Sequence, residues 1–160
     1  MQAAIQFFKD ALRHETKASA FYTKAAEITR DDESRMLYLK LAGMEDDHAN
    51  QLLEKVKNAP CGQAFDVDGF VRELENSTES SISPTDMHLI ETGTMRQVLE
   101  LAITYENQAC KNYENLANET TDPDIKAHCL DAVKEERSHV RDLTNLLNSL
   151  DMADDDRPGL

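Results

Sequence analysis

The sequence predicts an all-α protein, a four-helix bundle with a long crossover between its second and third helices. The 160 residues include only five glycines and four prolines, and 30% of them are charged, which suits long amphipathic helices. Glutamate, histidine and tyrosine positions also repeat at an offset of 91 residues, so each half of the chain reads as one helical hairpin. We therefore expect a single domain that spans residues 1–151.

The first hairpin is predicted to consist of helices at residues 3–29 and 32–57. Asp31 or Asp32 is suited to cap the second helix, and Asn58-Ala59-Pro60 ends it. Along each helix, one set of mostly apolar residues recurs at steps of three and four, so its members lie on one face of the helix. We call this face the inward stripe. These residues are Ile5, Phe8, Leu12, Glu15, Ser19, Tyr22 and Ala26, then Tyr38, Leu41, Glu45, His48 and Leu52.

Residues 58–92 break this periodicity and are predicted to form the crossover. They contain Pro60, Gly62, Pro84 and a stretch rich in serine and threonine, with a short helix expected at residues 67–75. A helix of about 25 residues is roughly 38 Å long, a distance that the crossover can span. The second and third helices can therefore run parallel.

The second hairpin is predicted to consist of helices at residues 94–118 and 123–150. Thr94 with Gln97 offers a capping box, and Asp122-Pro123 opens the last helix. The inward stripes are Leu99, Ile103, Glu106, Cys110, Tyr113 and Ala117, then Cys129, Ala132, Glu136, His139, Leu143, Leu146 and Leu150. Residues 152–160 form an acidic tail that we expect to be disordered.

Six residues on these stripes are candidate metal ligands: Glu15, Glu45, His48, Glu106, Glu136 and His139. A single Glu-x-x-His is a common chance match, but two such motifs that each follow a glutamate by 30 residues are not. Four carboxylates in an apolar core would repel one another and lose hydration. Two divalent cations would balance their charge. Iron, manganese or a mixed pair suits these ligands, and zinc is not excluded.

Net charge and hydrophobicity exclude other classes of function. A formal net charge of −14 argues against nucleic-acid binding, which needs a basic face. No apolar run approaches the length of a membrane span, and the amino terminus lacks a signal-peptide pattern. The cysteines, Cys61, Cys110 and Cys129, form no C-x-x-C pair, which excludes the usual rubredoxin-type or zinc-ribbon framework. We expect a cytoplasmic protein with reduced thiols.

Four segments carry a resemblance to a known family. They are His-Glu-Thr-Lys-Ala-Ser-Ala-Phe-Tyr at 14–22, Leu-Ala-Gly-Met-Glu-Asp-Asp-His at 41–48, Glu106 seven residues before Tyr113, and Glu-Glu-Arg-Ser-His at 135–139. Over residues 3–150 the chain resembles the ferritin-like superfamily, closest to the rubrerythrin group. The resemblance implies a homodimer with two iron ions, bridged by Glu45 and Glu136. Glu15 and Glu106, and likewise His48 and His139, would each serve one ion.

The function that the resemblance implies is reduction of peroxide or dioxygen, with electrons from an external donor. Two features depart from the rubrerythrin pattern: the rubredoxin cysteines are missing, and Gln108, Ala109 and Cys110 occupy the turn where that family carries an additional glutamate. Two alternatives stay open. One is a ferroxidase or iron-handling protein with iron(II) as its substrate, and the other is a bundle with a purely structural metal.

Five residues near the six candidate ligands also carry predictions. Tyr22 and Tyr113 lie two turns from their glutamates, and we interpret them as core tyrosines bonded to a carboxylate rather than as electron carriers. His14 points about 100° away from Glu15 and is predicted to be a surface residue. Cys110 and Cys129 are predicted to be apolar filler, with a redox-sensitive thiol pair as the alternative.

Overall fold

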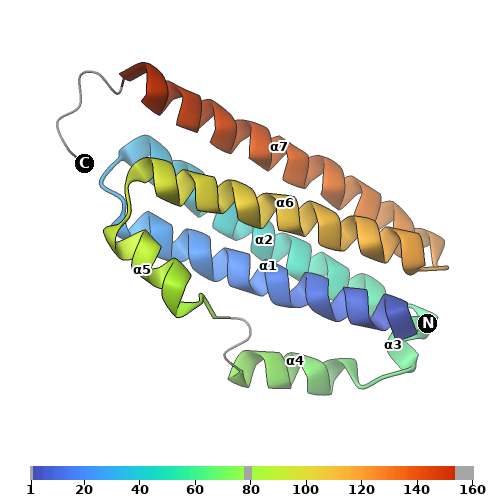
Figure 1. The fold of residues 1–160 in the computed structure, drawn as a ribbon. Helices are drawn as coiled ribbons and strands as arrows, with labels where there is room; N and C mark the ends of the chain where they lie inside the picture. Colours follow the sequence, from blue (N-terminus) through green and yellow to red (C-terminus); the bar gives the residue numbers. More distant parts are fainter. Residues whose placement is uncertain (1, 78–80, 154–160) are drawn as a thin grey trace.

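Four long helices lie side by side and form the body of the molecule (Figure 1). The computed structural model describes residues 2–77 and 81–153, without the side chains of 151–153. The long helices are α1 (Gln2–Ile28), α2 (Asp32–Lys57), α6 (Met95–Glu119) and α7 (Pro123–Ala153). Their bounds agree with the predicted hairpins to within a few residues. The predicted acidic tail begins inside α7, and its residues 154–160 lie outside the described part of the chain.

The helices pack in the predicted order and direction. The pairs α1 with α2 and α6 with α7 are antiparallel hairpins, whereas α2 and α6 run parallel (Figure 1). The described residues form no strand, and none of their helices is long and apolar enough to cross a membrane. The predicted all-α bundle with a long crossover is therefore confirmed.

The helix ends follow the capping signals in the sequence. The Asp31 side chain accepts a hydrogen bond from the Ser34 backbone N–H at 2.9 Å. Thr94 and Gln97 form a capping box at the start of α6. The Asp122 side chain accepts hydrogen bonds from two backbone N–H groups in the first turn of α7. These bonds satisfy N–H groups that have no partner within the helices.

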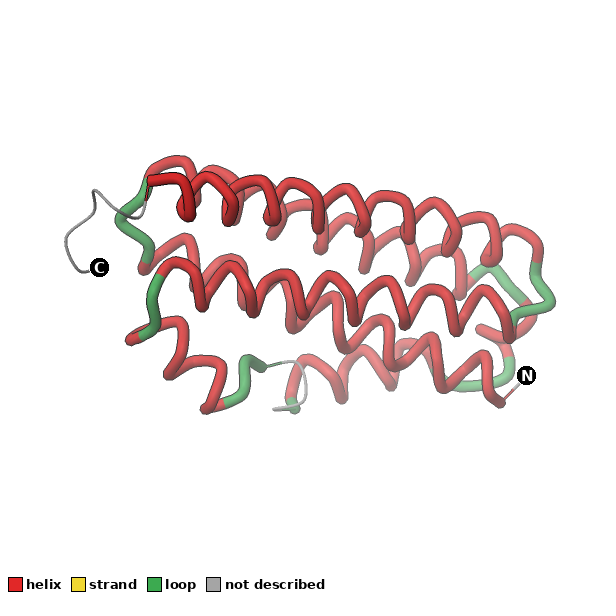
Figure 2. Tube along the Cα trace, turned by 45° about the horizontal axis from the view of Figure 1, so that its top comes forward, coloured by secondary structure: helices red, strands yellow, loops and turns green. Residues whose placement is uncertain are grey.

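The crossover is more helical than predicted. It contains the expected helix as α4 (Val67–Asn76), and in addition α3 (Pro60–Gln63) and α5 (Pro84–Thr92). Figure 2 shows these short helices along one side of the bundle. At one end, Phe8 of α1 contacts Phe65 and Phe70, with ring centroids 5.8 and 6.2 Å apart. At the other end, the Tyr105 hydroxyl donates a hydrogen bond to Asp86 of α5 at 2.6 Å.

Two apolar clusters fill the bundle, one toward each end. Along α1, for example, residues 4–12 belong to one cluster and residues 18–26 to the other, with Glu15 between them. The other three long helices are divided in the same way. Most predicted stripe residues are buried, although Ile5, Ser19 and Ile103 are only half-buried. The helices thus enclose a thin polar layer between two apolar cores.

Candidate metal centre

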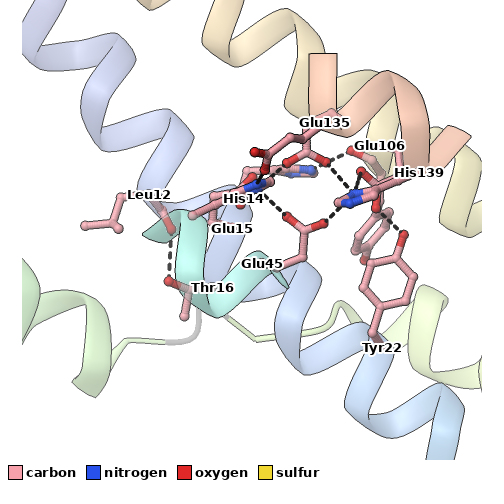
Figure 3. A network of polar contacts seen from close by, with 12 residues as sticks. Leu12, His14, Glu15, Thr16, Tyr22, Glu45, Glu106, Glu135 and His139 are labelled. Carbon is pink, nitrogen blue, oxygen red and sulfur yellow. Dashed lines mark hydrogen bonds and ion pairs between the residues drawn. The ribbon is translucent and has the colours of Figure 1, made fainter. Parts of the chain in front are cut away.

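The six predicted ligands all lie in this polar layer. Each long helix supplies at least one of them, and every one of the six residues is at most 3% exposed. Figure 3 shows four of them, Glu15, Glu45, Glu106 and His139, with their side chains directed toward a common centre. This convergence follows from the sequence, because the helical stripes place each ligand midway between the two apolar clusters.

The ligand atoms form two groups that share two members. In each group, one oxygen or nitrogen from each of four residues lies within 4.8 Å of all the others. One group consists of Glu15, Glu45, His48 and Glu136, and the other of Glu45, Glu106, Glu136 and His139. Glu45 and Glu136 belong to both groups, so two cations held here would be joined by two carboxylates.

Both imidazoles direct Nδ1 toward the carboxylates. Nδ1 of His48 lies 2.6 Å from Glu136, 3.3 Å from Glu15 and 3.5 Å from Glu45. Nδ1 of His139 lies 3.2 Å from Glu136, 3.3 Å from Glu45 and 3.4 Å from Glu106. The two rings are stacked, 6.0 Å apart between centroids and inclined by 18°. In both groups, therefore, the same ring nitrogen faces the position that a metal would occupy.

The unpaired atoms of this layer indicate that a cation belongs here. Both oxygens of Glu15 and of Glu45 are buried and have no hydrogen-bond partner among the described residues. The same holds for one oxygen each of Glu106 and Glu136. Buried polar atoms are normally paired, and unpaired buried carboxylate oxygens are costly. Oxygen and imidazole donors in this number suit divalent iron or manganese, so the residues fit the predicted metal pair.

In the absence of metal, the four glutamates separate into two classes. Burial and the neighbouring Glu45 raise the pKa of Glu15 well above its ordinary value. Burial, with Glu136 adding to it, raises the pKa of Glu106 to about 10. Burial also acts against the charge of Glu45, but its contacts with His139 and His48 hold its pKa below the ordinary value. Contacts with Glu106 and the two histidines do the same for the pKa of Glu136. These shifts favour the ionised form of the shared glutamates and the protonated form of the other two.

The histidines complete the charge balance. Burial alone would lower the pKa of His48, but its contacts with Glu136 and Glu15 raise it far above the ordinary value. The pKa of His139 rises to about 12 because its contacts with Glu106 and Glu136 outweigh burial. Two imidazolium groups then offset two carboxylates, and the metal-free layer is neutral. Metal ions would replace the four protons that the ligands hold.

The tyrosines beside the ligands differ from each other. The Tyr22 hydroxyl donates a 2.6 Å hydrogen bond to Oε1 of Glu106, as predicted for a core tyrosine (Figure 3). Tyr113, at the same place in the repeat, is fully buried, and its hydroxyl has no hydrogen-bond partner among the described residues. Its ring lies 6.3 Å from that of His48. Only one of the two predicted tyrosine–carboxylate bonds is therefore present.

Two residues near the site differ from the sequence interpretation. His14, predicted to be a surface residue, is half-buried, and its Nε2 lies 2.7 Å from the backbone carbonyl oxygen of Tyr105. The prediction was wrong because the ring reaches the adjacent helix α6 rather than solvent. Glu135 was not among the predicted site residues, yet its Oε2 lies 2.5 Å from Nε2 of His48. A signal for it was present, because only the second half of the repeat has two consecutive glutamates before x-x-His.

Cys110 and Cys129 are both buried, as predicted for apolar filler. Ala109 and Cys110 are buried, whereas Gln108 is exposed and donates a hydrogen bond to Asn112 at 2.9 Å. Burial and the charge of Glu136 raise the pKa of the Cys110 thiol to about 11, and burial raises that of Cys129 to about 12. Both thiols are therefore protonated at neutral pH. A redox role for this pair stays a prediction.

Comparison with known families agrees with the geometry. The family model described as rubrerythrin matches residues 6–147, which is most of the chain. The chain belongs to the rubrerythrin family. Searches of curated proteins and of solved structures found no match. Membership establishes a ferritin-like bundle of the rubrerythrin type and supports iron as the metal for the buried carboxylate and histidine groups.

Proposed function

We propose that this rubrerythrin-family protein is a non-haem di-iron oxidoreductase that reduces peroxide or dioxygen. The observation that supports the proposal is the pair of four-ligand groups that share Glu45 and Glu136. Two bound iron(II) ions would each supply one electron, and peroxide needs two electrons to become water. Manganese, or one ion of each metal, would fit the same ligands.

The protein would position the two ions and shield them from bulk water. Glu15 with His48 would hold one ion and Glu106 with His139 the other, while the shared glutamates would hold both. Tyr22 fixes the orientation of Glu106 through its hydrogen bond. The apolar clusters on either side keep bulk water away, which strengthens the electrostatic interactions at the site.

A second function, iron handling, is favoured by one observation. The three cysteines in these 160 residues form no C-x-x-C pair, and Cys110 and Cys129 are buried. Repeated reduction of peroxide would thus depend on a separate electron donor. A ferroxidase needs no such donor, because iron(II) is both its substrate and its reductant.

Rapid mixing distinguishes these functions. The protein is loaded anaerobically with two equivalents of iron(II) and mixed with peroxide or with dioxygen, and the absorbance of the ferric product is followed. Fast oxidation by peroxide and slow oxidation by dioxygen are expected. Renewed rounds of peroxide consumption should then require only an added reductant.

Two other outcomes would contradict the leading proposal. If excess iron(II) is oxidised rapidly by dioxygen, far beyond two ions per chain, the protein handles iron. If the loaded metal is neither oxidised nor exchanged, it has a structural role. The external donor, the homodimer and the cytoplasmic location expected from the sequence remain predictions.

A further inference from the structure

The two histidines of the site have different surroundings at the ring nitrogen that faces away from the carboxylates. Nε2 of His48 lies 2.5 Å from Oε2 of Glu135. Nε2 of His139 is buried and has no hydrogen-bond partner among the described residues. Nδ1 of both rings faces Glu136, at 2.6 Å for His48 and 3.2 Å for His139. The two halves of the site thus differ in whether the outer ring nitrogen of the histidine has a carboxylate partner.

The sequence explains the difference. Glu135 directly precedes Glu136 on α7, and the position that corresponds to it in the first half is Met44, directly before Glu45 on α2. A methionine thioether is a weak acceptor and carries no charge. The repeat therefore places a carboxylate at this position only on α7. The Glu135 side chain is 53% exposed, so this contact joins the buried site to the surface.

A carboxylate at Nε2 prepares the other ring nitrogen for a metal. A carboxylate only accepts hydrogen bonds, so Nε2 of His48 is the donor, and Nδ1 is left to present its lone pair to a metal. Such an outer carboxylate also fixes the ring and increases its basicity as a ligand. His139 has no comparable group.

Glu15 and Glu106, the glutamates that would each hold one ion, also differ in a way that favours the position beside His48. Both oxygens of Glu15 are without a hydrogen-bond partner among the described residues, whereas Oε1 of Glu106 accepts the bond from Tyr22. More donor atoms are thus available beside His48 than beside His139. This observation is independent of Glu135.

We propose that Glu135 is a positioning residue that makes the two metal positions unequal, so that the position beside His48 binds its ion first and more tightly. The inference rests on the metal pair of the proposed function, and it does not depend on which reaction the pair performs. It assigns an order of loading to a site whose six ligands repeat in the two halves of the sequence.

An anaerobic titration of the metal-free protein with cobalt(II) tests this proposal. Visible absorption and calorimetry are recorded for the wild type and for Glu135→Ala and Glu135→Gln. The wild type should bind two ions in separate steps. Loss of an outer-shell partner typically weakens metal binding by about 10–100-fold. Glu135→Ala should weaken the first step by this factor and leave the second unchanged. Glu135→Gln, which keeps an acceptor but no charge, should fall between.

Two variants serve as matched controls. Asp131→Asn removes one negative charge from an exposed position one turn earlier on α7 and should change neither step. Met44→Glu places a carboxylate at the corresponding position on α2 and should strengthen the second step. Circular dichroism verifies the fold of each variant. If Glu135→Ala does not fold, Glu135→Gln decides the result.

Other outcomes of the titration would each contradict one part of the proposal. Two equal steps in the wild type would contradict the proposed inequality. A Glu135→Ala variant that weakens neither step, or an Asp131→Asn variant that weakens the first step equally, would exclude a positioning role for Glu135. A wild type that binds no cobalt(II) would remove the metal pair itself and, with it, the proposed function.

Discussion

At the scale of single residues, the site is governed by a balance between protons and metal. Four of the six ligands, Glu15, Glu106, His48 and His139, have a raised pKa in the metal-free layer. A metal ligand must be deprotonated, so metal uptake must release these protons. In the metal-free protein, protons on these residues would thus provide the charge balance that metal ions provide in the complex.

This balance predicts how metal binding depends on pH. Binding of two ions should release about four protons near pH 7, or about two per ion. Because protons leave on binding, acid weakens the complex, and the apparent affinity for each ion should rise up to about 100-fold per pH unit between pH 6 and 8. Calorimetry of iron(II) binding in buffers with different ionisation enthalpies measures the proton release. An affinity that is independent of pH in this window would contradict the assigned protonation states.

The two tyrosines predict a contrast in stability. Tyr22→Phe leaves Oε1 of Glu106 buried without its donor, which should lower the free energy of unfolding of the metal-free protein by about 1–3 kcal/mol. Tyr113→Phe removes a hydroxyl that has no hydrogen-bond partner among the described residues, so it should leave the stability unchanged or increase it. Urea denaturation of both variants provides the comparison. Equal losses would show that Tyr113 is also bonded.

The sequence predicts that the six candidate ligands lie together, as they do in the structure, but not all of the contacts around them. The six ligands are recognisable because their repeat and helical spacing depend only on local geometry. Glu135 was missed because an exposed position lies off the inward stripe, and its reach to His48 depends on how α2 and α7 pack. His14 was assigned to the surface for a related reason: the path of the adjacent helix α6 decides its environment.

At the scale of elements, two glycines have opposite roles. A Cβ on Gly62 would collide with the backbone carbonyl oxygen of Val56, because α3 turns back closely against the end of α2. A Cβ on Gly43, within α2, would meet no atom within 4 Å beyond its chain neighbours and the adjacent backbone of its own helix. Glycine is required at the first position, whereas at the second it only lowers helix stability.

These glycines give a paired prediction. Gly43→Ala should increase the free energy of unfolding by about 0.5–1 kcal/mol, because alanine has the higher helix propensity. Gly62→Ala should lower it, since the backbone must shift to admit the methyl group. Thermal and urea denaturation of the two variants measures both effects. Stabilisation by Gly62→Ala would mean that α3 does not approach α2 as described.

The long helices could be predicted from sequence, but most of the crossover could not. Capping residues such as Asp31 and Thr94 directly precede long helices with a periodic buried face. The capping signal and the apolar periodicity therefore predict the same helix start. Helix α5 was missed although Ser83-Pro84 forms a start signal, with the Ser83 side chain accepting a bond from the Asp86 N–H. Its nine residues are too few for a clear period, and the Asp86–Tyr105 bond that holds it is a tertiary contact.

At the scale of the whole molecule, the polar layer is where all four long helices meet. Metal ions bound there would be held by all four helices and would link the two hairpins. Binding to the folded state alone should stabilise it by about 2.7 kcal/mol per site at a free metal concentration 100 times Kd. For a chain of this length, each kcal/mol raises Tm by roughly 2–4 °C.

Thermal unfolding checks this link between metal and stability. Addition of anaerobic iron(II) should raise Tm, and a chelator should reverse the change. Glu45→Gln, which weakens a ligand of both groups, should largely abolish the increase. An equal rise in Tm in that variant would show that the stabilising metal binds elsewhere.

The most direct test of the account is an anaerobic iron(II) titration of the metal-free protein and of two single variants, with bound iron counted after removal of free metal. The wild type should bind two ions per chain. Glu15→Gln should affect chiefly one ion, whereas Glu45→Gln should weaken both, because Glu45 belongs to both groups. A wild type that does not bind two ions, or a Glu45→Gln variant that retains both with unchanged affinity, would contradict the shared metal site.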